Sequence, residues 1–252
     1  FATTTADSSG DWSVTTPAMI DGVHSLIASA YFYDSGDRTT SNALVVTIDT
    51  TAPSVASVPV LSPSSDSNIV TDSTPTFIGT AETGSLITLY ANNIAVGNTT
   101  ASAGGYSVTS LADLGNNLYS FHVVSSDIAG NESSNSPTLS LYIDNSAPIL
   151  EALSALTLDE GETTELSVSF TDASPQSQDR TATINWGDGT TSNGTISFSG
   201  GTGTVTASHS YGSAGSYTIT LTITDEESLT DSEQASVPVT DAPPQVSFRI
   251  DA

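Results

Sequence analysis

The side chains of this chain that could do chemistry are almost all carboxylates. Asp and Glu together number 28 among 252 residues, against three Arg and no Lys, so the formal net charge is −25. Carboxylates in loops supply the hard oxygen ligands that Ca²⁺ takes in sets of about six to eight. The chain has no Cys, which excludes disulfides and thiolate metal sites. Without Lys, it also cannot form the Lys-based amide bonds that cross-link some proteins.

Residue patterns typical of catalysis are missing. The three histidines, His24, His122 and His209, lie far apart in the sequence, and none has a partner at metal-ligand spacing. We expect each of them to be a structural histidine on a strand. There is no Gly-x-Ser-x-Gly motif, no phosphate-binding glycine loop that leads into a helix, and no EF-hand loop. These observations predict a protein without enzymatic activity.

An Ile-Asp pair followed by Ala-Pro recurs along the chain. It reads IDTTAP and IDNSAP in its first two copies and TDAP in a weaker third, and the copies end at Pro53, Pro148 and Pro243. These prolines are 95 residues apart both times. A period of this length, ending in a β-rich run and a proline, is typical of immunoglobulin-sized sandwich domains joined by short stiff linkers.

The register of the repeat predicts the domain boundaries. Residues 6–53 match the second half of the unit that follows, so we expect the sequence to be a window on a longer polypeptide. The predicted segments are the C-terminal half of an Ig-like domain at 1–53, a complete Ig-like domain at 54–148, a third domain at 149–243, and a linker with the first strand of a further domain at 244–252.

Composition and alternation both indicate strands. Ser, Thr, Gly, Ala and β-branched residues dominate, and only 12% of the residues are charged. Apolar and polar residues alternate in short runs, as at 85–90 and 217–223, with Gly and Asn turns between the runs. The complete unit has about seven such runs, the number expected of an immunoglobulin-like sandwich. The predicted fold class is all-β, with tandem immunoglobulin-like β-sandwich domains arranged end to end.

Three separated motifs characterise the complete unit. They are TAETGS at 80–85, DIAGN at 127–131 and IDNSAP at 143–148. In this order they resemble the bacterial Ig-like repeats of large secreted adhesins and biofilm surface proteins, and the resemblance extends to residues 1–53. It implies an extracellular segment, and it implies that Ca²⁺ is often present at the linkers between such repeats.

The third unit carries a different set of motifs. Trp186 supplies a large ring to bury, and the Gly187-Asp188-Gly189 turn that follows needs positive φ. The motifs are DEGE at 159–162, SFTD at 169–172, ATINWGDGT at 182–190, SHSY at 208–211 and GSYTITLTITD at 215–225. This set is similar to a PKD domain, a β-sandwich of surface proteins and a spacer in secreted hydrolases, which implies a non-catalytic extracellular segment. The family's last motif ends in Asp-Gly, whereas here Asp225 precedes Glu226, which adds charge to the loop.

Sandwich topology predicts where the carboxylates meet. The last strand of each unit ends at the pole opposite its B–C and F–G loops, so tandem units meet bottom to top. Carboxylates in such a junction repel one another unless a cation neutralises them, and Ca²⁺ is the hard ion that loop oxygens bind. The predicted ligands between the second and third units are Glu82, Asp113, Asp144, Asp172, Asp179, Asp225, Glu226 and Glu227, and those between the first and second are Asp21, Asp49, Asp127, Asn131 and Glu132.

Two interpretations of these acids remain open at this point. The acids could bind structural Ca²⁺ at one or more junctions, or they could be solvated loop residues on a generally acidic, salt-adapted surface. Spacing alone does not decide between them. The resemblance to adhesin repeats favours calcium.

The sequence favours a non-catalytic repeat segment of a large extracellular bacterial surface protein, acting as an adhesin stalk or spacer. Two alternatives stay open: a subunit of a self-assembling filament, sheath or surface layer, and the accessory modules of a secreted polysaccharide- or protein-degrading enzyme. Expected partners are host or environmental glycans and surfaces, reached through other parts of the chain, and further copies that pair at strand edges. The charge of −25 argues against nucleic acid. No apolar run approaches the roughly 20 residues that cross a bilayer.

Overall fold

The computed structural model describes residues 1–32, 35–65, 68–173 and 180–243, and these residues form β-strands and no helix. The all-β class predicted from the sequence is therefore confirmed. Internal contacts divide the chain into two compact units. The first unit holds residues 1–62, 76–110 and 121–139, and the second holds residues 63–75, 111–120 and 140–252.

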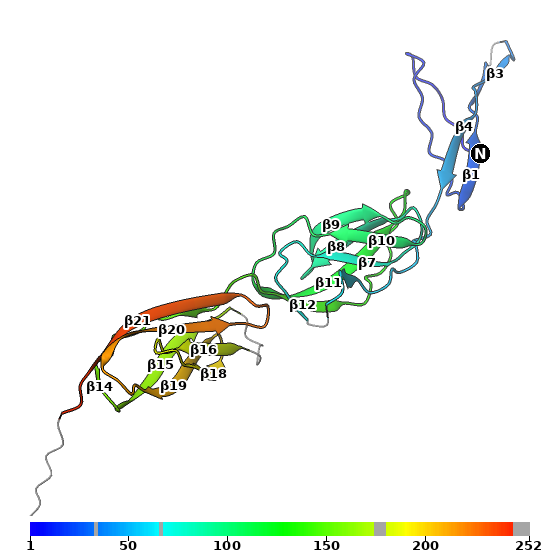
Figure 1. The fold of residues 1–252 in the computed structure, drawn as a ribbon. Coiled ribbons are helices and arrows are strands. Elements are labelled where there is room, and N and C mark those ends of the chain that lie inside the picture. Colours follow the sequence, from blue (N-terminus) through cyan, green and yellow to red (C-terminus); the bar gives the residue numbers. More distant parts are fainter. Residues whose placement is uncertain (33–34, 66–67, 174–179, 244–252) are drawn as a thin grey trace, which may run out of the picture. The chain divides into compact units, whose positions relative to one another are not determined.

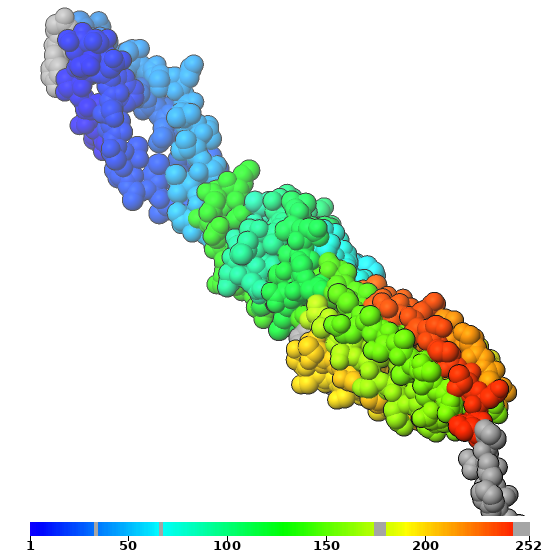
Figure 2. Space-filling view, turned by 90° about the vertical axis from the view of Figure 1, so that its left-hand side faces the viewer, coloured from blue at the N-terminus to red at the C-terminus, as the bar shows by residue number. Residues whose placement is uncertain are grey.

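The N-terminal strands of the first unit form two small sheets that bury little. The strands are β1 (Gly22–Leu26), β2 (Ser29–Tyr31), β3 (Arg38–Thr40) and β4 (Leu44–Ile48), and β1 pairs antiparallel with β4 and β2 with β3. None of the described residues before Pro53 is buried, and Val23 and Val45 are 73% and 64% exposed. Figure 2 shows open space between these residues, drawn in blue. This segment has strands but no hydrophobic core of its own.

The strands between residues 60 and 143 form two sheets, seen in Figure 1. They are β5 (Val60–Ser62), β6 (Ile69–Val70), β7 (Thr76–Thr80), β8 (Leu86–Ala91), β9 (Ile94–Thr100), β10 (Gly105–Thr109), β11 (Asn117–Ser126) and β12 (Leu139–Ile143). One sheet has the order β10-β7-β5 and the other β6-β12-β11-β8-β9. Phe77 of the first sheet meets Phe121 of the second with ring centroids 4.5 Å apart, and both are fully buried. The sequence predicted a first strand near Ile69 but missed β5.

The second unit contains a larger sandwich. One sheet has the order β13-β15-β19-β18 and the other β14-β21-β20-β16-β17. Its strands are β13 (Ile149–Leu150), β14 (Leu158–Asp159), β15 (Thr163–Thr171), β16 (Thr181–Asn185), β17 (Thr191–Asn193), β18 (Thr195–Ser199), β19 (Thr202–Ser210), β20 (Gly215–Thr224) and β21 (Thr230–Thr240). In β20 every second residue from Ile219 onward is fully buried, namely Ile219, Leu221 and Ile223, as the period of a strand requires. Asp144, Asp172 and Asp225 lie in the loops that follow β12, β15 and β20.

Candidate metal centre

Three carboxylates from two segments of the second unit come together. Asp144 follows the last residue of β12, and Asp225 and Glu227 lie in the turn between β20 and β21. Each offers one carboxylate oxygen, and these three oxygens lie within 4.8 Å of one another. Asp144 is fully buried, Asp225 is 5% exposed, and Glu227 is half-buried. Among the described residues they form the one group of three acidic, His or Cys side chains close enough to share an ion.

Local hydrogen bonds fix one oxygen of each aspartate and leave the other. The Oδ1 atom of Asp144 accepts from the backbone N and the Oγ of Ser146, both at 3.3 Å. The Oδ1 atom of Asp225 accepts from the backbone N of Leu229 at 2.8 Å, which closes the turn. The second oxygens, Oδ2 of both aspartates and Oε2 of Glu227, are buried and have no hydrogen-bond partner among the residues that the structure describes. A buried ionised carboxylate oxygen without a donor is costly, so either a proton or a bound cation would stabilise these three oxygens.

Burial and mutual repulsion raise the pKa of all three carboxyls. Desolvation is the largest cause for Asp144 and Asp225, and each also feels the charge of nearby Asp172. Desolvation, followed by the charges of Glu226, Asp225 and Asp144, raises the pKa of Glu227 to about 7. The ionised forms are therefore unfavourable here unless a cation is bound.

Asp172 lies beside this group but already has a countercharge. Its Oδ2 atom is 2.8 Å from Nε of Arg180, and both side chains are almost completely buried. The guanidinium of Arg180 also lies 3.7 Å from the centroid of the Phe198 ring. The hydroxyl of Tyr142 donates to the carbonyl of Ala173 at 2.8 Å, which ties β12 to the end of β15. Arg180 therefore neutralises Asp172 and leaves the carboxyls of Asp144, Asp225 and Glu227 without a paired cation among the described residues.

The donor set fits a hard divalent cation. All the ligand atoms are carboxylate oxygens, no thiolate is present in the chain, and the oxygens come from loops rather than from one rigid strand. Ca²⁺ takes such oxygens and completes its coordination with backbone carbonyls and water, whereas Zn²⁺ favours His and Cys. The residues that would hold the ion are Asp144, Asp225 and Glu227.

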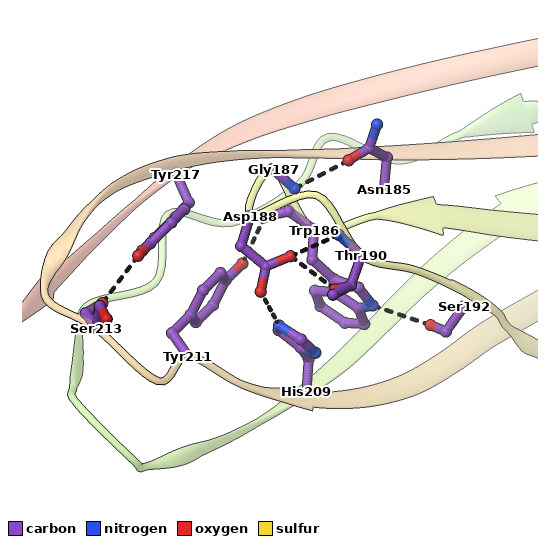
Figure 3. Close-up of polar contacts among 10 residues, drawn as sticks. All are labelled: Asn185, Trp186, Gly187, Asp188, Thr190, Ser192, His209, Tyr211, Ser213 and Tyr217. Atoms are coloured by element: carbon purple, nitrogen blue, oxygen red, sulfur yellow. Dashed lines mark hydrogen bonds and ion pairs between the residues drawn. The ribbon is translucent and has the colours of Figure 1, made fainter.

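A second polar cluster lies around Trp186 in the same unit (Figure 3). Nε2 of His209 lies 2.8 Å from Oδ2 of Asp188. The other oxygen of Asp188, Oδ1, accepts hydrogen bonds from the backbone N of Thr190 at 2.9 Å and from the Oγ1 hydroxyl of Thr190 at 2.6 Å. The imidazole stacks on the Trp186 ring at 4.7 Å, and the hydroxyl of Tyr211 donates to the Trp186 carbonyl at 3.0 Å. The Thr190 hydroxyl donates to Asp188 and not to His209, so the cluster lacks the arrangement of an activated nucleophile. It holds a turn in place.

Family models match most of the described chain. The bacterial Ig-like domain matches residues 59–145, and the PKD domain matches residues 145–240. Residues 59–240 therefore match a bacterial Ig-like domain followed by a PKD domain. Modules of these two kinds are typically non-catalytic. No curated protein matches the chain.

Two solved structures of low sequence identity are among those similar to this chain. A titin I-band fragment, I67–I69, is 16% identical, with 77% of this chain and 67% of that chain covered and a TM-score of 0.48. An adhesin described as Ca²⁺-stabilised, which helps an Antarctic bacterium reach out and bind ice, is 21% identical. The matched region covers 96% of this chain and 62% of the adhesin chain, with a TM-score of 0.38. The described residues contain no helix long and apolar enough to cross a membrane.

The PKD motifs explain the cluster of Figure 3. Gly187 and Gly189 have φ of 82° and 93°, as the sequence predicted. At Gly187 a Cβ atom would lie 2.5 Å from the backbone O of Thr218, so a side chain is excluded there as well. Trp186 is 1% exposed, which confirms the predicted buried ring. The WGDGT residues build the core and its turn, and of the three clustered acids only Asp225 belongs to a PKD motif, as the last residue of the stretch at 215–225.

The structure gathers some of the predicted metal ligands and not others. Asp144, Asp225 and Glu227 form the cluster, and Asp172 adjoins it in its pair with Arg180. Glu226 lies on the same turn but is exposed. Glu82 and Asp113 are not part of the cluster, and Oε2 of Glu82 accepts from the backbone N of Ser54 at 3.2 Å. Asp179 lies outside the described residues.

The ligands predicted for the first junction are joined by hydrogen bonds within the first unit. Nδ2 of Asn131 donates to Oδ2 of Asp127 at 2.8 Å and to the carbonyl of Asp49 at 3.1 Å. Asp21 accepts from the backbone N and the hydroxyl of Thr50. Glu132 is exposed. The bond from Asn131 is the main reason that the pKa of Asp127 is lowered, whereas that of Asp225 is raised.

Proposed function

We propose that this chain is a non-catalytic repeat segment of a large extracellular bacterial surface protein, an adhesin stalk or spacer that binds Ca²⁺ at Asp144, Asp225 and Glu227. The observation that carries the calcium site is the set of three buried carboxylate oxygens without a hydrogen-bond donor. The Ig-like and PKD families support a spacer role. The charge of −25 without Lys suits a segment exposed to divalent cations and argues against nucleic acid as a partner.

The ion would fix the chain where it enters the PKD domain. Asp144 precedes the PKD match by one residue, and Asp225 and Glu227 lie in its last hairpin. An ion that binds only the folded arrangement stabilises it by about 2.7 kcal/mol when free Ca²⁺ is about 100 times Kd. Without the ion, the three carboxylates repel one another and loosen this contact. A cation-dependent stiffness is what a spacer under load requires.

Calorimetric titration of the chelator-treated chain with Ca²⁺ tests the site. We expect binding together with a higher melting temperature, and we expect Asp144→Asn and Glu227→Gln to weaken both effects. Glu226→Gln is the matched control, because it removes the same charge from an exposed position on the same turn. Equal losses in Glu226→Gln and Glu227→Gln, or no binding by the wild-type chain, would contradict the proposal.

A second candidate function is a subunit of a self-assembling filament or surface layer. The exposed apolar strand residues Val23, Leu44 and Val45 favour it, since strands β1 and β4 present them without a covering layer. Light scattering over a range of protein concentrations distinguishes the two functions. A spacer stays monomeric, whereas a filament subunit grows in mass and gives regular fibres under the electron microscope.

A further inference from the structure

Two turns, one in each family domain, have the same backbone hydrogen bonds. In the Ig-like domain, the N atom of Asp127 donates to the carbonyl of Asn131 at 3.1 Å, and the N atom of Asn131 donates back to Oδ1 of Asp127 at 2.9 Å. In the PKD domain, Asp225 and Leu229 make the same two bonds at 3.0 Å and 2.8 Å. Turn 127–131 therefore corresponds to turn 225–229, residue for residue.

The fourth residue of each turn confirms this correspondence. Gly130 and Ser228 both have positive φ, of 91° and 67°. Their N atoms donate to the carbonyls of Asp127 and Asp225 at 3.3 Å and 3.2 Å. Serine in this conformation is uncommon, so the turn in the PKD domain keeps the shape without the glycine that would favour it.

Each turn also lies near an aspartate that ends a strand of the preceding repeat. Asp49 follows β4 and Asp144 follows β12, and the Oδ1 atom of each accepts from the backbone N two residues later, at 3.1 Å and 3.3 Å. In the first unit, Asn131 reaches the carbonyl of Asp49. In the second unit, the carboxylate of Asp144 joins those of Asp225 and Glu227. The same arrangement, a five-residue turn beside an aspartate that follows a strand, therefore occurs twice, and we call each copy a frame.

After the shared aspartate the turns of the two frames differ at all four positions, and the differences that bear on the second oxygen of the aspartate are at the third and fifth. The Ig-like turn has Ala129 and Asn131, and the amide of Asn131 donates to Oδ2 of Asp127 at 2.8 Å. The PKD turn has Glu227 and Leu229 instead. The side chain of leucine has no donor, so Oδ2 of Asp225 is buried without a partner among the described residues, and Glu227 brings one more such oxygen. One turn satisfies its aspartate internally, and the other adds negative charge.

We propose that these two positions decide whether the turn holds a divalent cation. Asn at the fifth position makes an amide-locked turn that needs no ion, and Glu at the third position with an apolar residue at the fifth makes a cation site. The inference rests on the proposed calcium site at Asp144, Asp225 and Glu227, and it selects one of the two junctions that the sequence predicted. The turn at 127–131 then binds no ion, although it also contains an aspartate and faces Asp49.

Exchanging the two positions between the turns tests this inference. Calorimetric titration with CaCl₂ of the complete 252-residue chain is expected to give one ion per wild-type chain. Glu227→Ala combined with Leu229→Asn is expected to bind none, and Ala129→Glu combined with Asn131→Leu is expected to bind two. The added site should be the weaker, because Asp49 is exposed whereas Asp144 is buried.

Melting temperatures measured in chelator give a second test that does not depend on Ca²⁺ binding. Asn at position 229 can donate to Oδ2 of Asp225, and removal of Glu227 relieves repulsion, so the first double variant should melt at a higher temperature than the ion-free wild type. Leu229→Asn alone should weaken Ca²⁺ binding by about tenfold, since residues around a metal site commonly change affinity by that factor. This single change also serves if a double variant fails to fold.

The outcomes separate this inference from the proposed function. A wild-type chain that binds no Ca²⁺ overturns both. A wild type whose single ion persists in the first double variant, or a second double variant that still binds one ion, overturns the choice by these two positions and leaves the calcium site standing. Two ions on the wild-type chain, one of them lost on Asp127→Asn, would also overturn it.

Discussion

At the scale of single residues, Glu227 is expected to make the stability of the PKD domain depend on pH. Its pKa is raised to about 7 from 4.5, chiefly by burial and then by its acidic neighbours. The folded protein therefore binds a proton more tightly than the unfolded chain does. For such a group, stability is highest below the unfolded pKa and falls as pH rises through the folded pKa.

The ion-free chain should accordingly lose stability as pH rises from about 5 to 8. Asp144 and Asp225 act in the same direction, because their pKa values are also raised. Melting temperatures in chelator across this range measure the effect. Glu227→Gln should flatten the curve, and saturating Ca²⁺ should reverse its slope, because the ion binds the carboxylates. A wild-type curve that is flat in chelator would contradict the raised pKa values.

Asp188 shows the opposite electrostatics. Burial opposes its charge, but the hydrogen bonds from Thr190 and the contact with His209 outweigh burial and lower its pKa to about 2. Its contribution to stability is present above the ordinary value of 3.8 and is lost as pH falls through about 2. Asp188→Asn should lower the free energy of unfolding at pH 7 by about 1 to 2 kcal/mol. Urea denaturation measures it, with the exposed acid Glu160→Gln as the control.

At the scale of elements, each repeat fixes a strand with the same side-chain contact. The hydroxyls of Tyr119 and Tyr217 donate to the backbone carbonyls of Gly115 and Ser213, four residues upstream, at 3.2 Å and 2.9 Å. In the N-terminal segment, Nε2 of His24 lies 2.8 Å from the carbonyl of Ile20, also four residues upstream. This contact is the tyrosine corner of immunoglobulin-like sandwiches, with a histidine in the first copy.

Loss of the corner hydroxyl should therefore weaken each sandwich by a similar amount. Tyr119→Phe and Tyr217→Phe are each expected to cost about 1 kcal/mol, because one hydrogen bond to a backbone carbonyl is removed while the ring stays. Tyr90→Phe is the control, since Tyr90 contributes a ring stacked on His122 and its hydroxyl makes no hydrogen bond among the described residues. Denaturant titrations with the three variants test this, and a control that loses as much as the corners would contradict it.

At the scale of the whole molecule, the end-to-end arrangement of the domains stays a prediction from the sequence. Pro53 and Pro148 lie in short linkers, and both features limit bending. The proposed ion adds a second constraint, because it joins Asp144 to the last hairpin of the PKD domain.

Removal of Ca²⁺ should thus make the chain more flexible as well as less stable. Small-angle scattering with and without chelator is expected to show a smaller maximum dimension and a broader distribution of distances in chelator. Asp144→Asn should give part of this change in the presence of Ca²⁺, because it removes one ligand. If neither the dimensions nor the melting temperature respond to the chelator, the acids are solvated surface residues and the ion has no role in stiffness.

The sequence by itself determined the all-β class, the repeat, and the identity of both family domains. Strand alternation and turn glycines are local, so they are visible without a structure, as at Ile219 to Ile223 and at Gly187. It missed β5, a three-residue strand between Pro59 and Pro63 whose pairing depends on β7. It also named thirteen residues as ligands at two junctions without showing which of them are buried together, because acidic residues in loops look alike in sequence.

Only the tertiary structure showed which acids are buried and which of the described ones lack a hydrogen-bond partner. Whether a carboxylate is satisfied depends on the partner that folding brings to it. The side-chain amide of Asn131 donates to Oδ2 of Asp127, whereas the side chain of Leu229 has no donor for Oδ2 of Asp225. Arg180 likewise could pair with any acid in the sequence, and the fold places it against Asp172. Desolvation depends on three-dimensional packing, so a buried, unpartnered oxygen leaves no local signal in the sequence.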